Sequence, residues 1–277
     1  MSASTLFNVQ HDLGLRPVSL TISIVSHGQM ALVLPLLRDL EHLHLQTPLE
    51  VILTLNIPEV MVYTADDFVF SLRILRNPQP LGFGANHNQA LAQAHCATVC
   101  ILNPDIRIVQ NPFPGLLALL EDPLVGLVAP AVYNPTGKLE DSARHFPSPW
   151  GIVAKAFMGK QQPDPAYARQ DQIFYPDWVG GMLMVLSADL YRRIGGFDEK
   201  FFLYYEDVDL CARIRLQGLQ VALMPHQGVI HDAQRSSHTQ RRYLQWHLSS
   251  MLRFFCSLVF IRVQLLRLHE QPLKHWP

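Results

Sequence analysis

Three carboxylates stand within four positions of the chain, at Glu206, Asp207 and Asp209, directly after an aromatic run. The pattern predicts that they open a helix ending near Gly218, where acids suit the positive end of the helix dipole and its free N–H groups. A charged first turn is the structural interpretation. The chemical interpretation is a general base, which a carboxylate at a helix start can provide because it stays ionised near neutral pH. Asp209 is expected to pair with Arg213 one turn later.

Two other polar groups lie far from this segment in the sequence. Asn103 and Asp105 follow an apolar strand, and an extended backbone lets side chains two residues apart point toward one cation. His231 follows another hydrophobic stretch, and imidazole with carboxylate oxygens suits Mn2+ better than Mg2+. The alternatives are a simple turn at Asn-Pro-Asp and a structural histidine. His226 is a weaker candidate ligand.

Alternating strand and helix patterns predict a parallel sheet that positions these groups. Ligands of such a sheet bind beyond the carboxyl ends of its strands, so the loops after residues 25, 55, 75 and 102 are expected to form one rim. Strands are predicted at 18–26, 50–55, 71–76, 98–102, 125–132, 182–186 and 221–224, and helices at 29–45, up to about 94 and from 206.

The rim carries candidate groups for a nucleotide. Ser26, Asn56 and Asn77 stand at strand ends. In the loop that follows, Gly82 permits close approach of the backbone to a ligand, and Asn88 can cap the next helix or bind a nucleotide. Taken on its own, this loop is predicted to be a turn, since its G-x-G-x-x-G pattern is incomplete.

The proline-rich segment 133–177 is typical of a loop or lid over a site, and it could bind an acceptor. Trp178 and Gly181 then lead into the strand at 182–186. Two interpretations of the tryptophan stay open: a core residue, or a platform for an acceptor sugar.

Composition limits the class of protein. At 277 residues with 49% hydrophobic side chains, the chain can bury the core of one large domain plus an appendage. Its four cysteines form no C-x-x-C pair, which favours reduced thiols in the cytoplasm over a zinc site. The N-terminus lacks a signal-peptide pattern, and the apolar run 254–261 is too short to span a membrane.

The C-terminal segment predicts one amphipathic helix over about 239–268, with arginines between its hydrophobic positions. From Arg235 onward the sequence contains seven basic residues and a single acidic one, Glu270. Such a helix can dock on its own catalytic domain or on a twin subunit as a homodimer, and we expect docking ahead of peripheral contact with the inner face of the cell membrane. Nucleic acid is a poor partner, because the basic residues alternate with large apolar ones.

In order along the chain, the motifs GFGANHNQA, LNPD, WVGGMLMVL, GGFDEKFFLYYEDVDLCARI and VIHD resemble the family-two glycosyltransferases of the GT-A fold, in particular rhamnosyltransferase-like bacterial members. The similarity runs from about Ser19 to Ser237. It implies an α/β GT-A nucleotide-diphospho-sugar transferase fold with a mostly parallel, Rossmann-like sheet. The implied catalytic domain covers 1–237, with its nucleotide part at about 18–132 and its acceptor part at about 133–237, and a helical extension covers 238–277.

The resemblance also implies roles for residues. Asp207 would be the base of an inverting displacement, and Glu206 could exchange with it. Asp105 and His231 would hold a divalent metal, Mn2+ or Mg2+, on the donor diphosphate, and Asn103 would make a weaker ribose or diphosphate contact. Acceptor contacts are implied at Trp178, Gly181 and Glu206.

The sequence departs from the family at two donor-binding places. Asn103 replaces the first Asp of the metal motif, and Leu55-Asn56 stands where an Asp that reads the nucleobase is common. The expected donor is dTDP-L-rhamnose, with a UDP- or GDP-sugar open, and the acceptor is a saccharide or lipid-linked glycan in cell-surface polysaccharide synthesis, such as that of O-antigen. The alternatives are a degenerate glycan- or nucleotide-binding relative and a metal-dependent phosphohydrolase built on Asp105, His226 and His231.

Overall fold

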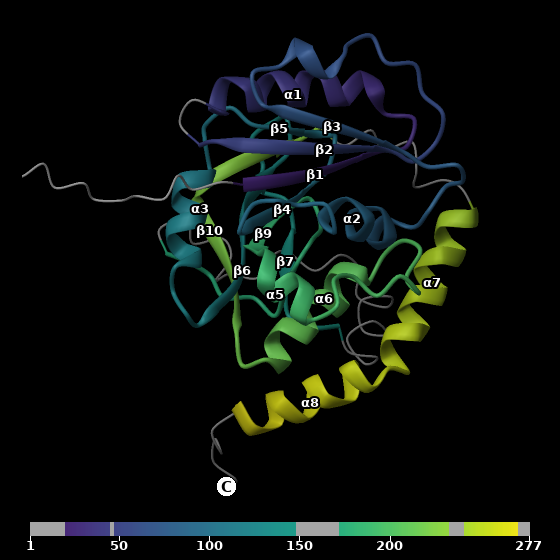
Figure 1. Cartoon of the computed structure of the whole chain (residues 1–277). Coiled ribbons are helices and arrows are strands. Elements are labelled where there is room, and N and C mark those ends of the chain that lie inside the picture. The colour runs from purple at the N-terminus through teal and green to yellow at the C-terminus, as the bar shows by residue number, and fades with distance from the viewer. Residues whose placement is uncertain (1–19, 45–46, 148–171, 233–240, 271–277) are drawn as a thin grey trace, which may run out of the picture.

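A central sheet of eight strands runs through the molecule, in the order β3-β2-β1-β4-β9-β6-β10-β5 (Figure 1). The computed structural model describes residues 20–44, 47–147, 172–232 and 241–270. The strands are β1 (Leu20–Ser26), β2 (Leu49–Leu55), β3 (Ser71–Arg76), β4 (Thr98–Leu102), β5 (Ile106–Arg107), β6 (Val125–Tyr133), β9 (Leu183–Ser187) and β10 (Gln220–His231). A separate pair is formed by β7 (Ala143–Arg144) and β8 (Trp178–Val179).

The helices lie on both faces of this sheet, as the alternating pattern predicts. They are α1 (Met30–His44), the short 3-10 helix η1 (Ala65–Asp67), α2 (Phe83–Leu91), α3 (Phe113–Leu120), α5 (Ala188–Arg193), α6 (Glu206–Leu216), α7 (Arg241–Phe255) and α8 (Leu258–Glu270). One apolar layer packs α1 and α3 against the sheet, and a second packs α2, α5 and α6. The predicted GT-A class of α/β fold is confirmed.

Strand directions set the shape of the rim. β3, β2, β1 and β4 run parallel, whereas β9 is antiparallel to both β4 and β6. In the parallel part Ser26 lies beside Leu55, and Leu55 lies beside Arg76. The amide of Asn56 donates to the Ser26 carbonyl at 2.9 Å, and the amide of Asn77 donates to the Leu55 carbonyl at 3.0 Å. The loops after these strands therefore meet at one edge.

β10 is longer than the predicted strand at 221–224 and continues to His231. Pro225 and Gly228 break the sequence pattern, and the pairing of β10 with β6 shifts register between Met224 and Gly228. Proline cannot donate to the ladder, so such an irregularity is the expected way for a strand to continue past it. The two-residue strand β5 was not predicted, because so short a run carries no periodicity.

The single C-terminal helix predicted over 239–268 is wrong, because two helices, α7 and α8, occupy this part of the chain. The Ser257 hydroxyl donates to the Phe254 carbonyl at 2.7 Å and accepts from the Phe260 amide at 3.0 Å, so it caps α8 where α7 ends. Among the described residues no one helix has the length and apolarity to cross a bilayer, although the two together reach that composition across a bend of 61°. They wrap the outside of the domain (Figure 1).

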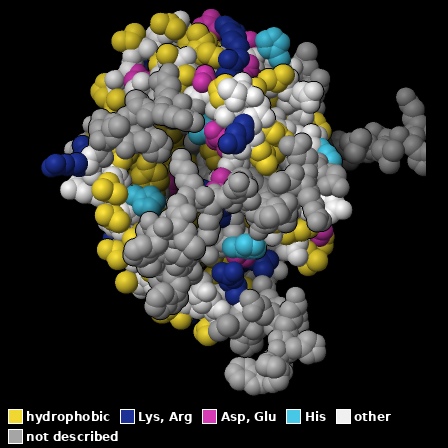
Figure 2. All heavy atoms as spheres, turned by 180° about the vertical axis from the view of Figure 1, so that it is seen from behind, with side chains coloured by type: hydrophobic (Ala, Val, Ile, Leu, Met, Phe, Trp, Pro, Cys, Tyr) yellow, Lys and Arg dark blue, Asp and Glu magenta, His cyan; other side chains and the backbone are white. Residues whose placement is uncertain are grey.

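Part of the segment predicted as a lid, 148–171, lies outside the described residues. Its described ends pair with each other, because Ala143 and Arg144 of β7 face Val179 and Trp178 of β8. Seen from behind, the described residues mix hydrophobic, basic and acidic side chains (Figure 2).

Candidate active site

The loop that carries the paired acids has a strained backbone. Tyr204 and Tyr205 have φ angles of 71° and 67°, in the left-handed region that residues with a side chain rarely occupy. Each such residue costs about 1–3 kcal/mol, so the surrounding structure must hold it. Helix α7 does so: the Ser250 hydroxyl donates to the Leu203 carbonyl at 2.9 Å, and the Phe254 ring lies 5.8 Å from that of Tyr205. Nothing in the sequence pattern predicted this strain.

Asp207 is held by backbone amides at the start of α6. Its two carboxylate oxygens accept from the amides of Val208 at 2.8 Å and Gly181 at 3.2 Å. Burial of the carboxyl raises the pKa of Asp207 to about 6, although these amides and the charge of Arg144 act to lower it. Asp207 is therefore mostly ionised at neutral pH and can accept a proton.

Glu206 sits in a different environment although it is the next residue. Its side chain is buried, and its Oε2 has no hydrogen-bond partner among the described residues. Burial, together with the charge of Asp207, raises the pKa of Glu206 well above its ordinary value. Burial and the charge of Asp207 thus favour the protonated form of Glu206, whereas two backbone amides and Arg144 favour the ionised form of Asp207, which supports Asp207 as the base.

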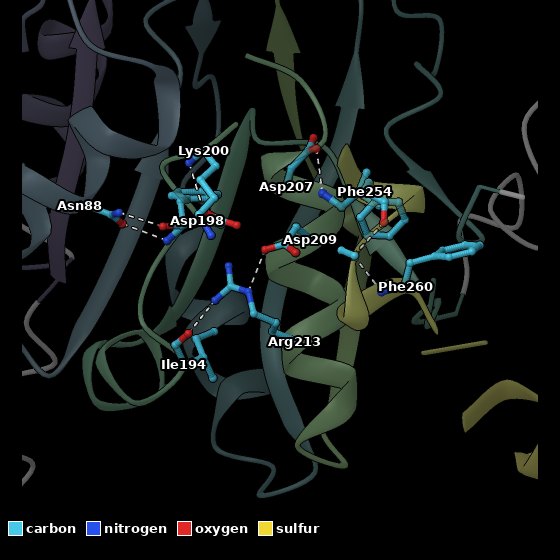
Figure 3. Close-up of polar contacts among 12 residues, drawn as sticks. Asn88, Ile194, Asp198, Lys200, Asp207, Asp209, Arg213, Phe254 and Phe260 are labelled. Carbon is cyan, nitrogen blue, oxygen red and sulfur yellow. Dashed lines mark hydrogen bonds and ion pairs between the residues drawn. The ribbon is translucent and has the colours of Figure 1, made fainter. Parts of the chain in front are cut away.

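The remaining acid of the segment is structural. Asp209 is buried and accepts from the Arg213 guanidinium at 2.8 Å, as the spacing of one turn predicts. Arg213 also donates to the Ile194 carbonyl at 2.6 Å, which ties α6 to the end of α5 (Figure 3). The pair anchors the helix whose first turn carries Asp207.

Sheet pairing brings the second set of polar groups together. β5 pairs antiparallel with β10, so that His231 faces Ile106 and its side chain lies next to Asp105. The Nε2 of His231 lies 3.2 Å from an Asp105 oxygen, and its Nδ1 lies 2.8 Å from a Glu140 oxygen. The predicted partners thus meet across 126 positions of sequence, and Glu140 joins them.

Glu140 was not singled out from the sequence. It falls in the irregular segment after β6, where its amide donates to the Val132 carbonyl at 2.8 Å. Burial alone would lower the pKa of His231, but hydrogen bonds and charges from Asp105 and then Glu140 outweigh it and raise the pKa to about 9. In the absence of a metal the ring is therefore an imidazolium held between two carboxylates.

Asp105 and His231 fit a divalent cation as a pair of ligands. The second oxygen of Asp105 is buried with no hydrogen-bond partner in the described structure, and it adjoins the imidazole ring. One carboxylate and one imidazole form a donor set suited to Mn2+. Within the described ranges no three His, Cys, Asp or Glu side chains are grouped to hold a metal, so a bound ion would take its other ligands from the substrate and water.

The lack of such a group among the described residues argues against the phosphohydrolase alternative. His226, the other histidine considered for such a site, has an exposed side chain. A dense His and Asp cluster is therefore not found in the described part of the chain, and the hydrolase interpretation loses its support.

Residues 180–182 form hydrogen bonds both with Asp207 and with the turn that carries Asp105. The amide of Gly181 donates to Asp207, and the carbonyl of Met182 accepts from the Asn103 amide at 2.9 Å. A Cβ on Gly181 would lie 3.1 Å from the Phe83 ring, so a larger residue here would require the ring to shift by a few tenths of an ångström. The structure thus links the acids of α6 to the turn that carries Asp105.

Glu140 is tied to the same stretch from the other side. Its carbonyl accepts from the Ser142 amide at 2.9 Å, and the Ser142 carbonyl accepts from the Gly180 amide at 2.8 Å. Segments near positions 105, 140 and 207 are therefore hydrogen-bonded to residues 180–182, and His231 joins them through Asp105 and Glu140. That Asp207 faces a cation held by Asp105 and His231 across one sugar-sized gap stays a prediction.

Asn56 has its hydrogen-bonding capacity filled by the protein. Its amide nitrogen contacts the Leu81 carbonyl at 2.9 Å and the His27 ring at 3.1 Å, and its oxygen accepts from the Leu81 amide at 2.8 Å and from Asn77 at 2.9 Å. An amide side chain has four such positions. Asn56 holds the glycine loop in place, and direct reading of a nucleobase by this residue stays a prediction.

An unpredicted acid, Glu59, occupies the rim beside β1. Its carboxylate accepts from the Ser26 hydroxyl and from the amides of Gly28 and Met30, each at 2.9 Å. It therefore satisfies the free N–H groups at the start of α1. Asn77, the third predicted rim residue, donates to Asn86 at 2.6 Å and leaves its own buried oxygen without a partner in the described structure.

Gly82 and Asn88 contact the protein's own acidic loop. A Cβ on Gly82 would lie 2.7 Å from the Phe202 carbonyl oxygen. Asn88 accepts from the Phe197 amide and donates to its carbonyl, both at 2.9 Å, and accepts from the Tyr191 hydroxyl at 2.6 Å (Figure 3 shows Asn88 beside this loop). Both residues position the acids of α6, and their nucleotide-binding role stays a prediction.

Trp178 and Arg144 face each other across the β7–β8 pair, and the charge of Arg144 acts on Asp207. The Arg144 guanidinium lies 5.7 Å from the centre of the Trp178 ring and 2.6 Å from Asp141. The indole N–H of Trp178 donates to the His145 carbonyl at 3.0 Å. Arg144 comes from a segment without periodicity, so no sequence signal pointed to it. The acceptor role of Trp178 stays a prediction.

Comparison with known proteins finds glycosyltransferases similar to this chain. A family model described as the N-terminal domain of galactosyltransferase matches residues 167–240. The chain is 28% identical to rhamnosyltransferase WbbL of Escherichia coli K12 over 185 residues, which cover 62% of this chain and 69% of WbbL. It is similar to the rhamnosyltransferase-like glycosyltransferases of family two. A Mycobacterium tuberculosis N-acetylglucosaminyl-diphospho-decaprenol L-rhamnosyltransferase is 27% identical, with 60% of this glycosyltransferase chain and 61% of the relative covered.

Solved structures agree on the fold of this glycosyltransferase. GalNAc-T7 with UDP, GalNAc and Mn2+ matches with a TM-score of 0.59 at 13% identity, covering 79% of this chain and 44% of GalNAc-T7. The mannosyltransferase PcManGT from Pyrobaculum calidifontis with GDP-Man and Mn2+ matches with a TM-score of 0.57 at 17% identity, covering 84% and 64%. The chain thus spans about half to two thirds of these proteins.

Proposed function

We propose that this glycosyltransferase moves a sugar from a nucleoside-diphosphate donor to a glycan hydroxyl with inversion at the anomeric carbon. The observation that carries the proposal is the backbone bridge at residues 180–182, which joins an ionised carboxylate, Asp207, to the Asp105 and His231 pair. One end of the site can accept a proton, and the other can hold positive charge. A sugar transfer with a diphosphate leaving group needs both.

The acceptor oxygen attacks the anomeric carbon in this reaction. As that bond forms, the bond from the anomeric carbon to the diphosphate oxygen breaks, and its electron pair leaves with the diphosphate. The proton of the attacking hydroxyl passes to the Asp207 carboxylate, whose pKa of about 6 keeps it ionised at neutral pH. The backbone amides of Val208 and Gly181 hold this carboxylate in place.

Negative charge gathers on the departing diphosphate. Asp105 and His231 would hold a divalent metal, which when bound neutralises that charge. Glu140 fixes the orientation of the His231 ring through its 2.8 Å contact with Nδ1. Arg144 adds a positive charge on the acceptor side, near Asp207.

The donor we propose is dTDP-L-rhamnose. Two relatives named as rhamnosyltransferases support this choice over a UDP- or GDP-sugar. A lipid-linked saccharide acceptor in surface-polysaccharide synthesis is supported by the diphospho-decaprenol named for one relative and by an O-antigen biosynthesis protein of Myxococcus xanthus, which is 26% identical over 167 residues. We place the reaction in the cytoplasm, where such donors would be available.

A direct assay tests this function. The purified chain is incubated with dTDP-L-rhamnose, a UDP-sugar or a GDP-sugar, with and without Mn2+, and with a lipid-linked N-acetylglucosaminyl diphosphate as acceptor. We expect dTDP release and an inverted product with the first donor in the presence of Mn2+. Nucleotide binding without turnover, seen as a rise in melting temperature alone, would instead support a degenerate relative. A product of retained configuration would exclude direct displacement.

A further inference from the structure

The outer surface of α7 and α8 carries a row of exposed aliphatic side chains, called here the leucine face. Residues four apart along a helix share one side, and residues three or seven apart do so as well. Each side chain of the row is 44–69% exposed. The leucine face comprises Leu244, Leu248 and Leu252 of α7 and Leu258, Ile261 and Leu265 of α8.

The leucine face is not the side by which these helices pack on the catalytic domain. Ser250 and Phe254 of α7 and Val263 of α8 are buried and belong to that inner side. Phe254 and Val263 lie in one apolar cluster with Val208 of α6. Docking on the protein's own domain therefore uses the inner side, and the side chains of the leucine face remain 44–69% exposed.

The charges around the leucine face have one sign. From 241 to 267 the sequence contains five arginines and no acid. Arg241, Arg242, Arg253 and Arg262 have exposed side chains, whereas Arg267 lies 3.7 Å from Asp177. Basic and hydrophobic side chains lie together at the left edge of Figure 2, the side on which α7 lies in that view. A second copy of the face would place arginine against arginine, while an anionic surface would complement it.

We propose that the leucine face docks on a bilayer surface rich in anionic lipid, with the leucines in the interface and the arginines at the headgroups. Amphipathic helices that combine apolar and basic residues bind membranes in this way. The 61° bend between the helices suits a position on the surface. This proposal concerns a surface outside the catalytic site and holds whether or not dTDP-L-rhamnose is the donor.

Docking would place the acidic loop close to the lipid. Trp246 of α7 stacks on Phe202 with 4.7 Å between ring centres, and His247 lies 5.3 Å from the Tyr204 ring. One helix, about 10 Å across, therefore separates this strained loop from the bilayer surface. The arrangement gives Asp207 access to an acceptor carried by a lipid.

Flotation with vesicles tests the proposal without donor or acceptor. The full chain is mixed with vesicles of phosphatidylcholine alone or with phosphatidylglycerol added. We expect it to float with the anionic vesicles and to bind neutral ones at least about tenfold more weakly, because each basic side chain near an anionic surface adds roughly a factor of five. Equal binding to both vesicles, or no binding to either, would overturn the proposal.

Paired variants separate the two contributions. Leu248→Gln with Leu252→Gln should weaken binding to anionic vesicles at least about tenfold, since the apolar insertion is lost. Leu124→Gln, at a leucine that is 59% exposed before β6, is the matched control and should bind like the parent chain.

Reversal of charge gives an independent measure. Arg253→Glu with Arg262→Glu should weaken binding at least about twentyfold, whereas Lys138→Glu in the exposed turn after β6 should not change it. Unchanged melting temperatures establish that each variant is folded. If the chain sediments as a dimer that the leucine variants split, and does not float with vesicles, the leucine face is a contact between two copies and the proposal is wrong.

Discussion

Two regions of this glycosyltransferase contain carboxyl groups in different surroundings: the start of α6 and the end of β10. At the start of α6, burial raises the pKa of two adjacent carboxyls, and Arg144 acts against this rise at Asp207. At the end of β10, two carboxylates flank His231 and raise the pKa of the histidine to about 9. In the first region, burial favours the protonated form of both carboxyls. In the second region, two carboxylates surround the His231 imidazole, an arrangement that favours a positive charge there.

The largest effect on kcat is expected from replacing Asp207, the proposed proton acceptor. Asp207→Asn removes a base that contributes about 100- to 10,000-fold to the rate, so kcat should fall by that factor. Binding of the nucleotide, measured by thermal shift, should be unchanged, because Asp207 lies at the acceptor end of the site. Persistent turnover in the variant would show that the base lies elsewhere.

Asp105→Asn should act on the other region. An amide is a weaker ligand for a divalent ion than a carboxylate, so the Mn2+ concentration that stabilises the protein with bound nucleotide should rise about 100-fold. Melting curves recorded across a Mn2+ titration measure this without catalysis. A chelator should remove the stabilisation from the parent chain, and an unchanged Mn2+ requirement in the variant would exclude Asp105 as a ligand.

Glu140→Gln tests whether the unpredicted acid orients His231. Loss of such a supporting carboxylate typically weakens metal binding by about 10- to 100-fold. The same Mn2+ titration should show this shift, with Glu121→Gln on the exposed end of α3 as the control. If the two variants behave alike, Glu140 has no role in the metal site.

The dependence of kcat on pH should report the Asp207 pKa of about 6. Because only the ionised carboxylate accepts a proton, activity should be full above this pKa and fall about tenfold per pH unit below it. Initial rates between pH 5 and pH 8 at saturating donor, acceptor and Mn2+ give the curve. An acidic limb that lies near pH 4 would mean that burial does not control this carboxyl.

Glu206→Gln should have the smallest effect. The amide resembles the protonated acid that burial favours at Glu206, so kcat should fall by no more than about fivefold. Rates for this variant and for Asp207→Asn, measured side by side, separate the two acids. Loss of activity in Glu206→Gln with retention in Asp207→Asn would reverse their roles.

The strands of the sheet and the start of α6 could be predicted because each has a local signal. Buried parallel strands appear as apolar runs, and the acids at Glu206 and Asp207 stand at a helix start. The break between α7 and α8 escaped prediction, because the hydrophobic pattern continues through it while the Ser257 hydroxyl caps the second helix. Glu140, Glu59 and Arg144 escaped because they lie in irregular segments.

By itself the sequence singled out the residues proposed to carry the chemistry: the acids at 206 and 207, the carboxylate at 105 and the histidine at 231. Only the tertiary structure distinguishes the surroundings of the two acids, since a pKa depends on burial and on neighbours that are distant in the chain. The tertiary structure also shows that Asn56 and Asn88 form hydrogen bonds with other residues of the protein. It shows as well that the leucines of α7 are exposed. Local patterns specify residue types, whereas contacts between distant segments specify their charge, orientation and exposure.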